Sequence, residues 1–260
     1  MDGGERDIMD DQVKKEVLHR EVGSNIARRL ASAREIARMR EPSLKSAEQL
    51  SASKIIHPGM RDRRVLNAFR GLRTKLFGMN QGNGFVVMIS PVVPESGGSF
   101  TASNLASAIA LDETKTALLV DCNIRNPALH RLLDVEPKAG LTDYIEKPES
   151  TPVSALIHST GIPRLRLVPA GRPHESASDY YTSVHMEAFL DEVRSRYRER
   201  FVLIDAPSLK ESPDARILSE LSDTVILCVG YGKSTRRQIA EVAAEVGREK
   251  LAGVVFSEGG

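Results

Sequence analysis

The sequence predicts an α/β protein built on a doubly wound, mostly parallel sheet, and three observations support this fold class. First, six short and nearly all-apolar segments have the length of strands. Second, stretches with helical spacing of apolar residues lie between most of these segments. Third, polar residues follow the segments at 85–89, 117–120 and 201–204. This pattern is typical of parallel strands covered on both faces by helices, with a ligand site at the carboxyl ends of the strands.

The expected elements alternate in regular order along the chain. The predicted strands cover 85–89, 117–120, 165–168, 201–204, 225–229 and 251–256. The predicted helices cover 64–77, 99–111, 183–197, 214–221 and 235–249. The tetrapeptide Gly232-Lys-Ser-Thr235 imitates the end of a phosphate-binding loop. However, it follows a late strand and lacks the preceding glycine, so we interpret it as a helix cap.

The chain is expected to divide near residue 60. Residues 1–60 are predicted to be a helical or flexible appendage and linker, and residues 61–260 are predicted to be the α/β domain. Within the appendage, 14–40 has the pattern of a basic amphipathic helix, which would contact a partner or a membrane surface, or remain a solvated helix. The stretch 42–58, rich in serine and alanine, is typical of a linker.

Composition narrows the function classes. With 260 residues, 27% charged residues and a net charge of +1, the chain reads as a soluble globular protein with no global charge for nucleic acid. The apolar runs have the length of strands, so no transmembrane segment is expected and a cytoplasmic location is predicted. Cys122 and Cys228 lie in apolar strands and are interpreted as buried, reduced thiols, and the histidines lack metal-ligand spacing. Tyr180 and Tyr181 are interpreted as a packing pair at a helix start, with a phosphorylation site as the alternative.

The segment after the first strand, SPVVPESGGSFTASNLA at 90–106, stands where a nucleotide-binding loop belongs. Such a loop uses glycine for close backbone approach, helix N–H groups for phosphate oxygens, a lysine for the β- and γ-phosphates and a hydroxyl for Mg²⁺. Gly97 and Ser99 fill the glycine and hydroxyl positions, but Gly98 fills the lysine position. There is no lysine or arginine between Lys75 and Lys115, and Glu95 adds a negative charge. The residues alone therefore predict weak nucleotide binding and no efficient phosphoryl transfer.

Two other strand ends carry aspartates. Asp205 is placed to bind Mg²⁺ together with Ser99 if a nucleotide binds, whereas Asp121 has the neutral Asn123 as its companion two residues on. One such aspartate alone would be interpreted as a cap or turn residue, but two beside this loop favour a nucleotide-site origin. Asp121 and Asp205 are the catalytic candidates only if the site is active. The full candidate nucleotide site is Pro94, Gly97, Gly98, Ser99, Phe100, Asp121, Asn123, Arg125 and Asp205.

At this point the ordered motifs resemble a family. The loop with its Asn104-Leu-Ala, the run Leu-Leu-Val-Asp-Cys-Asn-Ile-Arg-Asn-Pro after the second strand, Val-Pro-Ala-Gly171 and Leu-Ile-Asp-Ala-Pro207 follow one another at the family's spacing. Together they resemble the cytoplasmic domain of the bacterial tyrosine autokinases of capsule and exopolysaccharide synthesis, which are related to the deviant-Walker P-loop ATPases of cell division and partitioning. The resemblance covers about residues 64–257 and implies a P-loop NTPase fold.

The departures from the family pattern concern charge. By the family's motifs, Gly98 replaces the loop lysine, Asn123 replaces a second aspartate, and Asn67 replaces a glutamate of the ring-assembly helix. Arg70 and Arg73 of that helix remain, so Asn67, Arg70 and Arg73 are the candidate oligomer or partner contacts. A tail of clustered tyrosines is not found after Tyr231.

The resemblance therefore implies a cytoplasmic regulatory or assembly subunit of exopolysaccharide or capsular polysaccharide synthesis and export, with a degraded kinase site. One alternative is an active ATP-dependent tyrosine kinase or ATPase that uses ATP, Mg²⁺ and an unusual cation. A second alternative is a membrane-associated positioning protein of the partitioning type. The implied partners are a membrane-bound chain-length regulator (co-polymerase), which would hold the protein at the inner face of the membrane, and an active kinase homologue.

Overall fold

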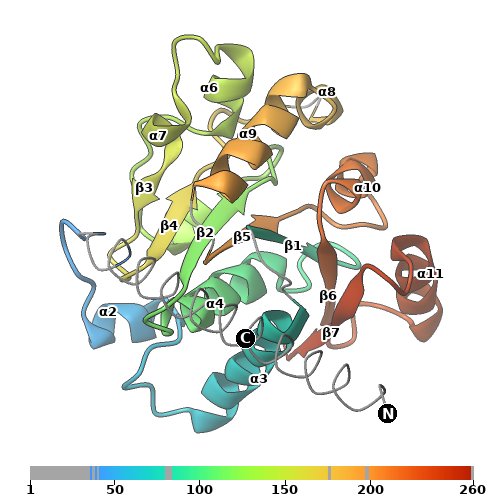
Figure 1. The fold of residues 1–260 in the computed structure, drawn as a ribbon. Coiled ribbons are helices and arrows are strands. Elements are labelled where there is room, and N and C mark those ends of the chain that lie inside the picture. Colours follow the sequence, from blue (N-terminus) through green and yellow to red (C-terminus); the bar gives the residue numbers. More distant parts are fainter. Residues whose placement is uncertain are drawn as a thin grey trace, which may run out of the picture.

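The protein is a seven-stranded sheet covered by helices on both faces (Figure 1). The computed structural model describes residues 36, 39, 41–79, 84–174, 177–196 and 199–258. The strand order is β3-β4-β2-β5-β1-β6-β7, and every pair is parallel except β3 with β4. The strands are β1 (Phe85–Pro91), β2 (Thr116–Asp121), β3 (His158–Ser159), β4 (Leu165–Val168), β5 (Arg200–Asp205), β6 (Thr224–Gly230) and β7 (Leu251–Ser257).

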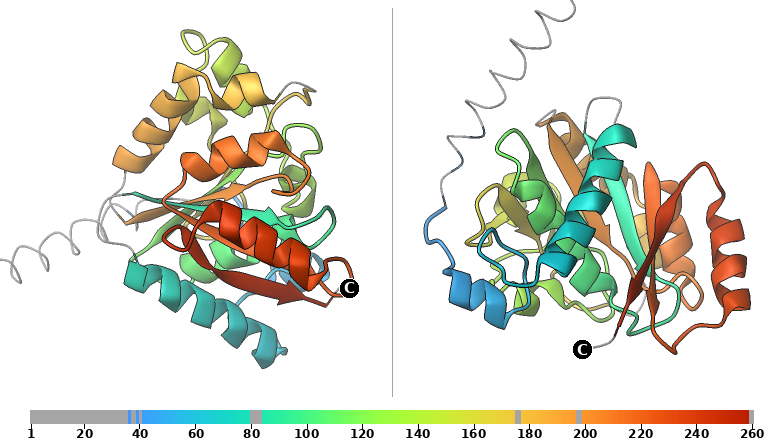
Figure 2. Two further views of the ribbon diagram at one scale, coloured as in Figure 1. Left: turned by 90° about the vertical axis from the view of Figure 1, so that its right-hand side faces the viewer. Right: turned by 90° about the horizontal axis from the view of Figure 1, so that it is seen from below.

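Helices lie on both faces of the sheet (Figure 2), and an apolar cluster joins the sheet to the helices on each face. On one face, α3 (Arg63–Met79) and α4 (Gly98–Ala110) pack against alternate residues of β1 such as Val87 and Ile89. On the other face, Val86 and Met88 of β1 contact the layer that contains α9 (Val184–Ser195), α10 (Pro213–Glu220) and α11 (Arg236–Val246). The central strands are buried on both sides, which is why they read as continuous apolar runs in the sequence.

The predicted fold class is confirmed, and all six predicted strands are present with small differences at their ends. The segment between β2 and β5 contains further short elements that periodicity did not predict, since each is only two to six residues long. These are α5 (Leu129–Leu132), α6 (Leu141–Glu146), α7 (Val153–Leu156), β3 and α8 (Ser178–Tyr181). As predicted, Thr235 is the N-cap of α11, with a capping box to Gln238.

The expected linker at 42–58 differs from the structure. It contains α2 (Ala47–Ala52), whose start is fixed by a capping box between Ser46 and Gln49. After it, Ile55 and Ile56 are buried in the α3 and α4 side of the core, and the Ile56 N–H donates to Asn104 Oδ1 at 2.8 Å. Burial of two isoleucines attaches this stretch to the α/β domain. Most of the predicted basic helix at 14–40 lies outside the described residues.

Candidate functional site

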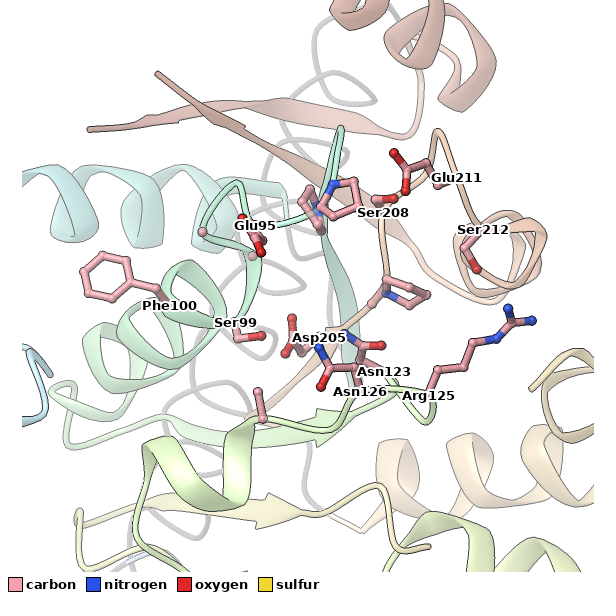
Figure 3. A pocket seen from close by; sticks show the side chains of 17 residues that line it. Glu95, Ser99, Phe100, Asn123, Arg125, Asn126, Asp205, Ser208, Glu211 and Ser212 are labelled. Atoms are coloured by element: carbon pink, nitrogen blue, oxygen red, sulfur yellow. The ribbon is translucent and has the colours of Figure 1, made fainter. Parts of the chain in front are cut away.

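A cleft of about 600 Å³ lies at the carboxyl ends of β1, β2 and β5 (Figure 3). Three loops line it: Pro91–Phe100 after β1, the segment from Asn123 to Ala128 after β2, and the segment from Asp205 to Ser212 after β5. Eight of the nine predicted nucleotide-site residues line this cleft: Pro94, Gly97, Gly98, Ser99, Phe100, Asn123, Arg125 and Asp205. The ninth, Asp121, is fully buried at the end of β2.

The loop after β1 has a wrapped backbone. Gly97 adopts the left-handed conformation with φ +81° as the N-cap of α4, and Glu95 is also left-handed with φ +57°. Gly97 provides no side-chain cap for the first N–H groups of α4, and Gly98, Ser99 and Phe100 of its first turn line the cleft, so this helix start suits an anion. The Ser99 hydroxyl points toward the Asp205 carboxylate, which brings the two predicted Mg²⁺ ligands together (Figure 3). Asp205 Oδ2 has no partner among the described residues, so this hydroxyl and carboxylate suit a hydrated Mg²⁺.

Packing limits the space for a side chain at Gly98, the residue that the sequence analysis places at the lysine position. Gly98 begins α4 with an ordinary negative φ, so its backbone would accept any residue. However, a Cβ atom at Gly98 would lie 2.9 Å from Cδ of Pro91, the last residue of β1. Pro91 is itself buried. A side chain at position 98 therefore requires this proline ring to move.

Asp121 holds the neighbouring loop. Its carboxylate accepts three backbone N–H groups: Oδ1 from Asn123 at 3.1 Å, and Oδ2 from Ala128 and Leu129, both at 3.0 Å. These bonds fix the loop from 122 to 129 and the start of α5. The turn-and-cap role that the sequence offered as an alternative is thus what the geometry of Asp121 provides.

Asp121 and Asp205 form a buried acidic pair on adjacent strands, with their Cα atoms in register. Burial raises the pKa of Asp121 to about 6, although its three N–H donors oppose the shift. Burial, together with the charge of Asp121, raises the pKa of Asp205 well above its usual value, and the Ser99 hydroxyl opposes this. A bound cation would reduce the repulsion between the two carboxylates when both are ionised.

The charges around the cleft are mostly negative. Glu95, Asp205 and Glu211 line it, and among the described lining residues Arg125 carries the positive charge. Arg125 forms an ion pair with the buried Asp214 at 3.1 Å. Beside the loop, Lys233 Nζ lies 3.0 Å from Glu95 Oε2. Sequence reasoning missed the roles of Pro91, Asp214 and Lys233, although the motif around Lys233 was an available signal.

The candidate contact residues on α3 have different surroundings. Asn67 is exposed and Arg70 is half-buried. Arg73 instead donates to the Ala108 carbonyl of α4 at 3.1 Å, and its guanidinium lies 5.6 Å from the centre of the Phe77 ring. Arg73 is therefore engaged within its own chain.

The other residues that sequence analysis singled out are structural. Tyr180 and Tyr181 pack at α8, with their hydroxyls donating to Glu146 Oε1 at 2.6 Å and to the Cys122 carbonyl respectively. Cys122 and Cys228 are buried free thiols, as predicted. In the described part of the chain, no group of three His, Cys, Asp or Glu side chains is arranged to hold a metal, and no helix is long and apolar enough to cross a membrane.

The sheet order, the loop into α4 and the cleft define a P-loop ATPase-type α/β domain. Solved structures agree: the kinase domain of Escherichia coli tyrosine kinase ETK superposes with a TM-score of 0.67 at 21% identity, covering 83% of this chain and 87% of that one. The cell division ATPase MinD of Pyrococcus furiosus superposes with a TM-score of 0.55 at 20% identity, covering 66% and 70%. At these identities the likeness establishes the fold.

The homologues of this chain are bacterial tyrosine-protein kinases. It is 31% identical over 196 residues to the putative tyrosine-protein kinase EpsB of Ralstonia nicotianae, covering 74% of this chain and 25% of EpsB. It is 28% identical to the tyrosine-protein kinase wzc of Salmonella typhimurium (76% and 27% covered) and to the tyrosine-protein kinase YwqD of Bacillus subtilis (66% and 71% covered). The chain thus spans about a quarter of the length of EpsB and wzc. No protein-family model matches it.

Proposed function

We propose that this chain is a kinase-fold regulatory or assembly subunit of exopolysaccharide or capsular polysaccharide synthesis, in which phosphoryl transfer has been lost. The observation that carries the proposal is the pair of Gly98 and Pro91: glycine stands at the expected lysine position, and the Pro91 ring crowds the space that the Cβ atom of a larger residue would take there. Phosphoryl transfer depends on positioned cations that neutralise charge on the transferred group. Here the loop brings Glu95 instead, and Arg125 is paired with Asp214.

In this proposal the residues around the cleft keep a binding role. The N–H groups at the start of α4 would hold phosphate oxygens, and Ser99 with Asp205 would hold Mg²⁺. Bound ATP and Mg²⁺ would supply a polyphosphate anion together with its divalent counter-ion. The partners we propose are a membrane-bound chain-length regulator and an active kinase homologue, with the regulator holding the protein at the inner face of the membrane.

Nucleotide turnover tests the proposal. We expect weak or undetectable binding of Mg²⁺·ATP by calorimetry, and no phosphotyrosine after incubation with ATP. A catalytic domain of a tyrosine-protein kinase homologue, assayed in parallel, is the positive control. Micromolar binding together with ATP turnover above a buffer blank would contradict the proposal.

The second candidate is an active kinase or ATPase of the same family. Lys233 favours it, since this lysine contacts the loop although it is distant in sequence from Glu95. Phosphate release that disappears in Lys233→Gln would support this candidate. A positioning protein of the partitioning type remains a third, and sedimentation with anionic lipid vesicles in the absence of any partner would support it.

A further inference from the structure

We infer that Lys233, from the turn between β6 and α11, is the cation of this nucleotide-type site, and that Glu95 occupies it in competition with a phosphate ligand. This inference rests on the proposed origin of the cleft as a nucleotide site and adds its regulation. Glu95 lines the cleft, and its carboxylate Oε2 lies 3.0 Å from Lys233 Nζ. The Glu95 carboxylate thus contacts Lys233 as an anionic ligand would.

The turn that carries Lys233 packs directly on the loop. Gly230 ends β6, and a Cβ atom there would lie 3.2 Å from both Ser96 Cα and Lys233 Cγ. The Lys233 N–H donates to the Gly230 carbonyl at 3.1 Å, which closes the turn. Beside it, the Ser257 hydroxyl of β7 donates to the Ser96 carbonyl at 3.1 Å. The ends of β6 and β7 therefore hold the outer side of the loop, and Lys233 reaches Glu95 from a fixed base.

Two other positions at the cleft, 98 and 125, offer no free cation. Position 98 is blocked by the Pro91 ring, and Arg125 is held by Asp214, which is 1% exposed. The Lys233–Glu95 pair is different because its carboxylate side chain is 84% exposed. An exposed ion pair is weak and easily exchanged, so a ligand with several negative charges can displace Glu95 from Lys233.

Two further features indicate a phosphate ligand with a divalent cation. The first turn of α4 lines the cleft, and its N-cap residue Gly97 provides no side-chain cap for the N–H groups there. Opposite it, Asp205 is 1% exposed, lines the cleft and keeps Oδ2 without a partner among the described residues. The ligand class is therefore a magnesium-bound nucleoside di- or triphosphate.

The test measures binding of Mg²⁺·ADP, which cannot be turned over as a phosphoryl donor. We expect Glu95→Gln to tighten binding about tenfold, because it removes a negative charge and frees Lys233. The double variant Glu95→Gln with Lys233→Gln should lose that gain. The gain should also shrink as salt rises, since it is electrostatic. Glu241→Gln, which breaks the exposed Arg237–Glu241 pair on α11, is the matched control and should leave binding unchanged.

Each outcome decides the inference. Unchanged affinity in Glu95→Gln, or equal gains in the single and double variants, would overturn the role of Lys233 while leaving the proposed loss of phosphoryl transfer intact. ATP turnover by the unmodified chain would instead contradict the proposed function. Circular dichroism of each variant verifies that the fold is retained, so that a change in affinity reports on the charges.

Discussion

At the scale of single residues, Pro91 and Gly98 decide whether the loop can hold a lysine. The Gly98→Lys substitution alone should destabilise the fold by about 1–3 kcal/mol, because its Cβ atom would overlap Pro91. It should not improve Mg²⁺·ATP binding. Adding Pro91→Ala removes the ring, so the double variant should recover stability and bind the nucleotide more tightly than the unmodified chain. Thermal unfolding and calorimetry measure both effects.

Pro91→Ala alone is the control for this pair, since it opens the space without adding charge. If Gly98→Lys alone improved binding with no loss of stability, the proline would not be the obstacle. The sequence predicts that Gly98 stands at the lysine position, but it does not reveal the close contact between Pro91 and Gly98. That contact depends on how tightly the loop turns at Gly97 between β1 and α4.

The buried Asp121 and Asp205 pair should make stability depend on pH. Their folded-state pKa values are raised above the usual value of 3.8, to about 6 for Asp121. Folding therefore favours the protonated forms: this stability is fully present below about pH 4 and is lost as pH rises through about 6. Asp205→Asn should therefore stabilise the protein more at pH 7.5 than at pH 4.

Chemical denaturation of both proteins across this pH range measures that difference. Burial is the largest cause of the raised pKa of Asp121, so Asp205→Asn should keep a smaller pH dependence of stability around pH 6. A stabilisation that is equal at pH 4 and pH 7.5 would show that the raised pKa values are not its source.

At the scale of elements, the loop precedes the N-terminus of α4, and two arginines from other parts of the chain bond to its C-terminus. Arg73 from α3 donates to the Ala108 carbonyl at 3.1 Å, and Arg164 donates to the Ala110 carbonyl at 2.9 Å. The last turn of α4 contains no basic residue of its own. These arginines therefore satisfy carbonyls that have no partner within the helix and complement its dipole.

We accordingly expect Arg73→Ala to destabilise the fold by about 1–2 kcal/mol, through the lost capping bond and the lost packing on Phe77. In a chain of this size, the midpoint temperature of thermal unfolding should fall by a few degrees. Arg70→Ala, one turn earlier on the same helix, is the matched control and should change stability by less than about 0.5 kcal/mol. Equal losses in the two variants would contradict the capping role of Arg73.

Elements differ in how far sequence could predict them. The sequence predicts the central strands from their continuous apolar runs, and it predicts α4 from its long stretch of helical spacing. The serines and alanines around α2 predict a linker, although Ser46 and Gln49 have the spacing of a capping box and two isoleucines follow. The short elements α5 to α8 have too few residues to show a period, so only tertiary packing defines them.

At the scale of the whole molecule, the strand order joins distant parts of the chain. Because β6 pairs with β1, the turn after β6 brings Lys233 to Glu95 across 138 residues. The sequence displayed Lys233 within a phosphate-loop-like tetrapeptide, but only the sheet order shows which loop it contacts. The converging strand ends, by contrast, were predictable, because parallel strands present their carboxyl ends at one edge.

The whole-molecule prediction concerns assembly through α3. With Asn67 exposed, Arg70 half-buried and Arg73 engaged with α4, this basic helix offers no acidic side chain for a reciprocal contact with another copy. We expect the 28.5 kDa chain to be a monomer or a loose oligomer by light scattering. Asn67→Glu supplies an acidic group on the exposed side and should raise the average mass in a concentration-dependent, salt-sensitive way.

Asn67→Gln is the control, since it lengthens the side chain without adding charge. A stable, ring-sized species of the unmodified chain would contradict the prediction, and so would equal masses for Asn67→Glu and Asn67→Gln. Charge reversal at Arg70 then tests hetero-assembly with a membrane-bound regulator. Arg70 suits this test because reversing its charge leaves the Arg73 bond to the end of α4 in place. Charge reversal at Arg73 would remove that bond, so a loss of stability could not be told from a loss of binding. Unchanged capture of the regulator by Arg70→Glu would exclude this side of α3 from the interface.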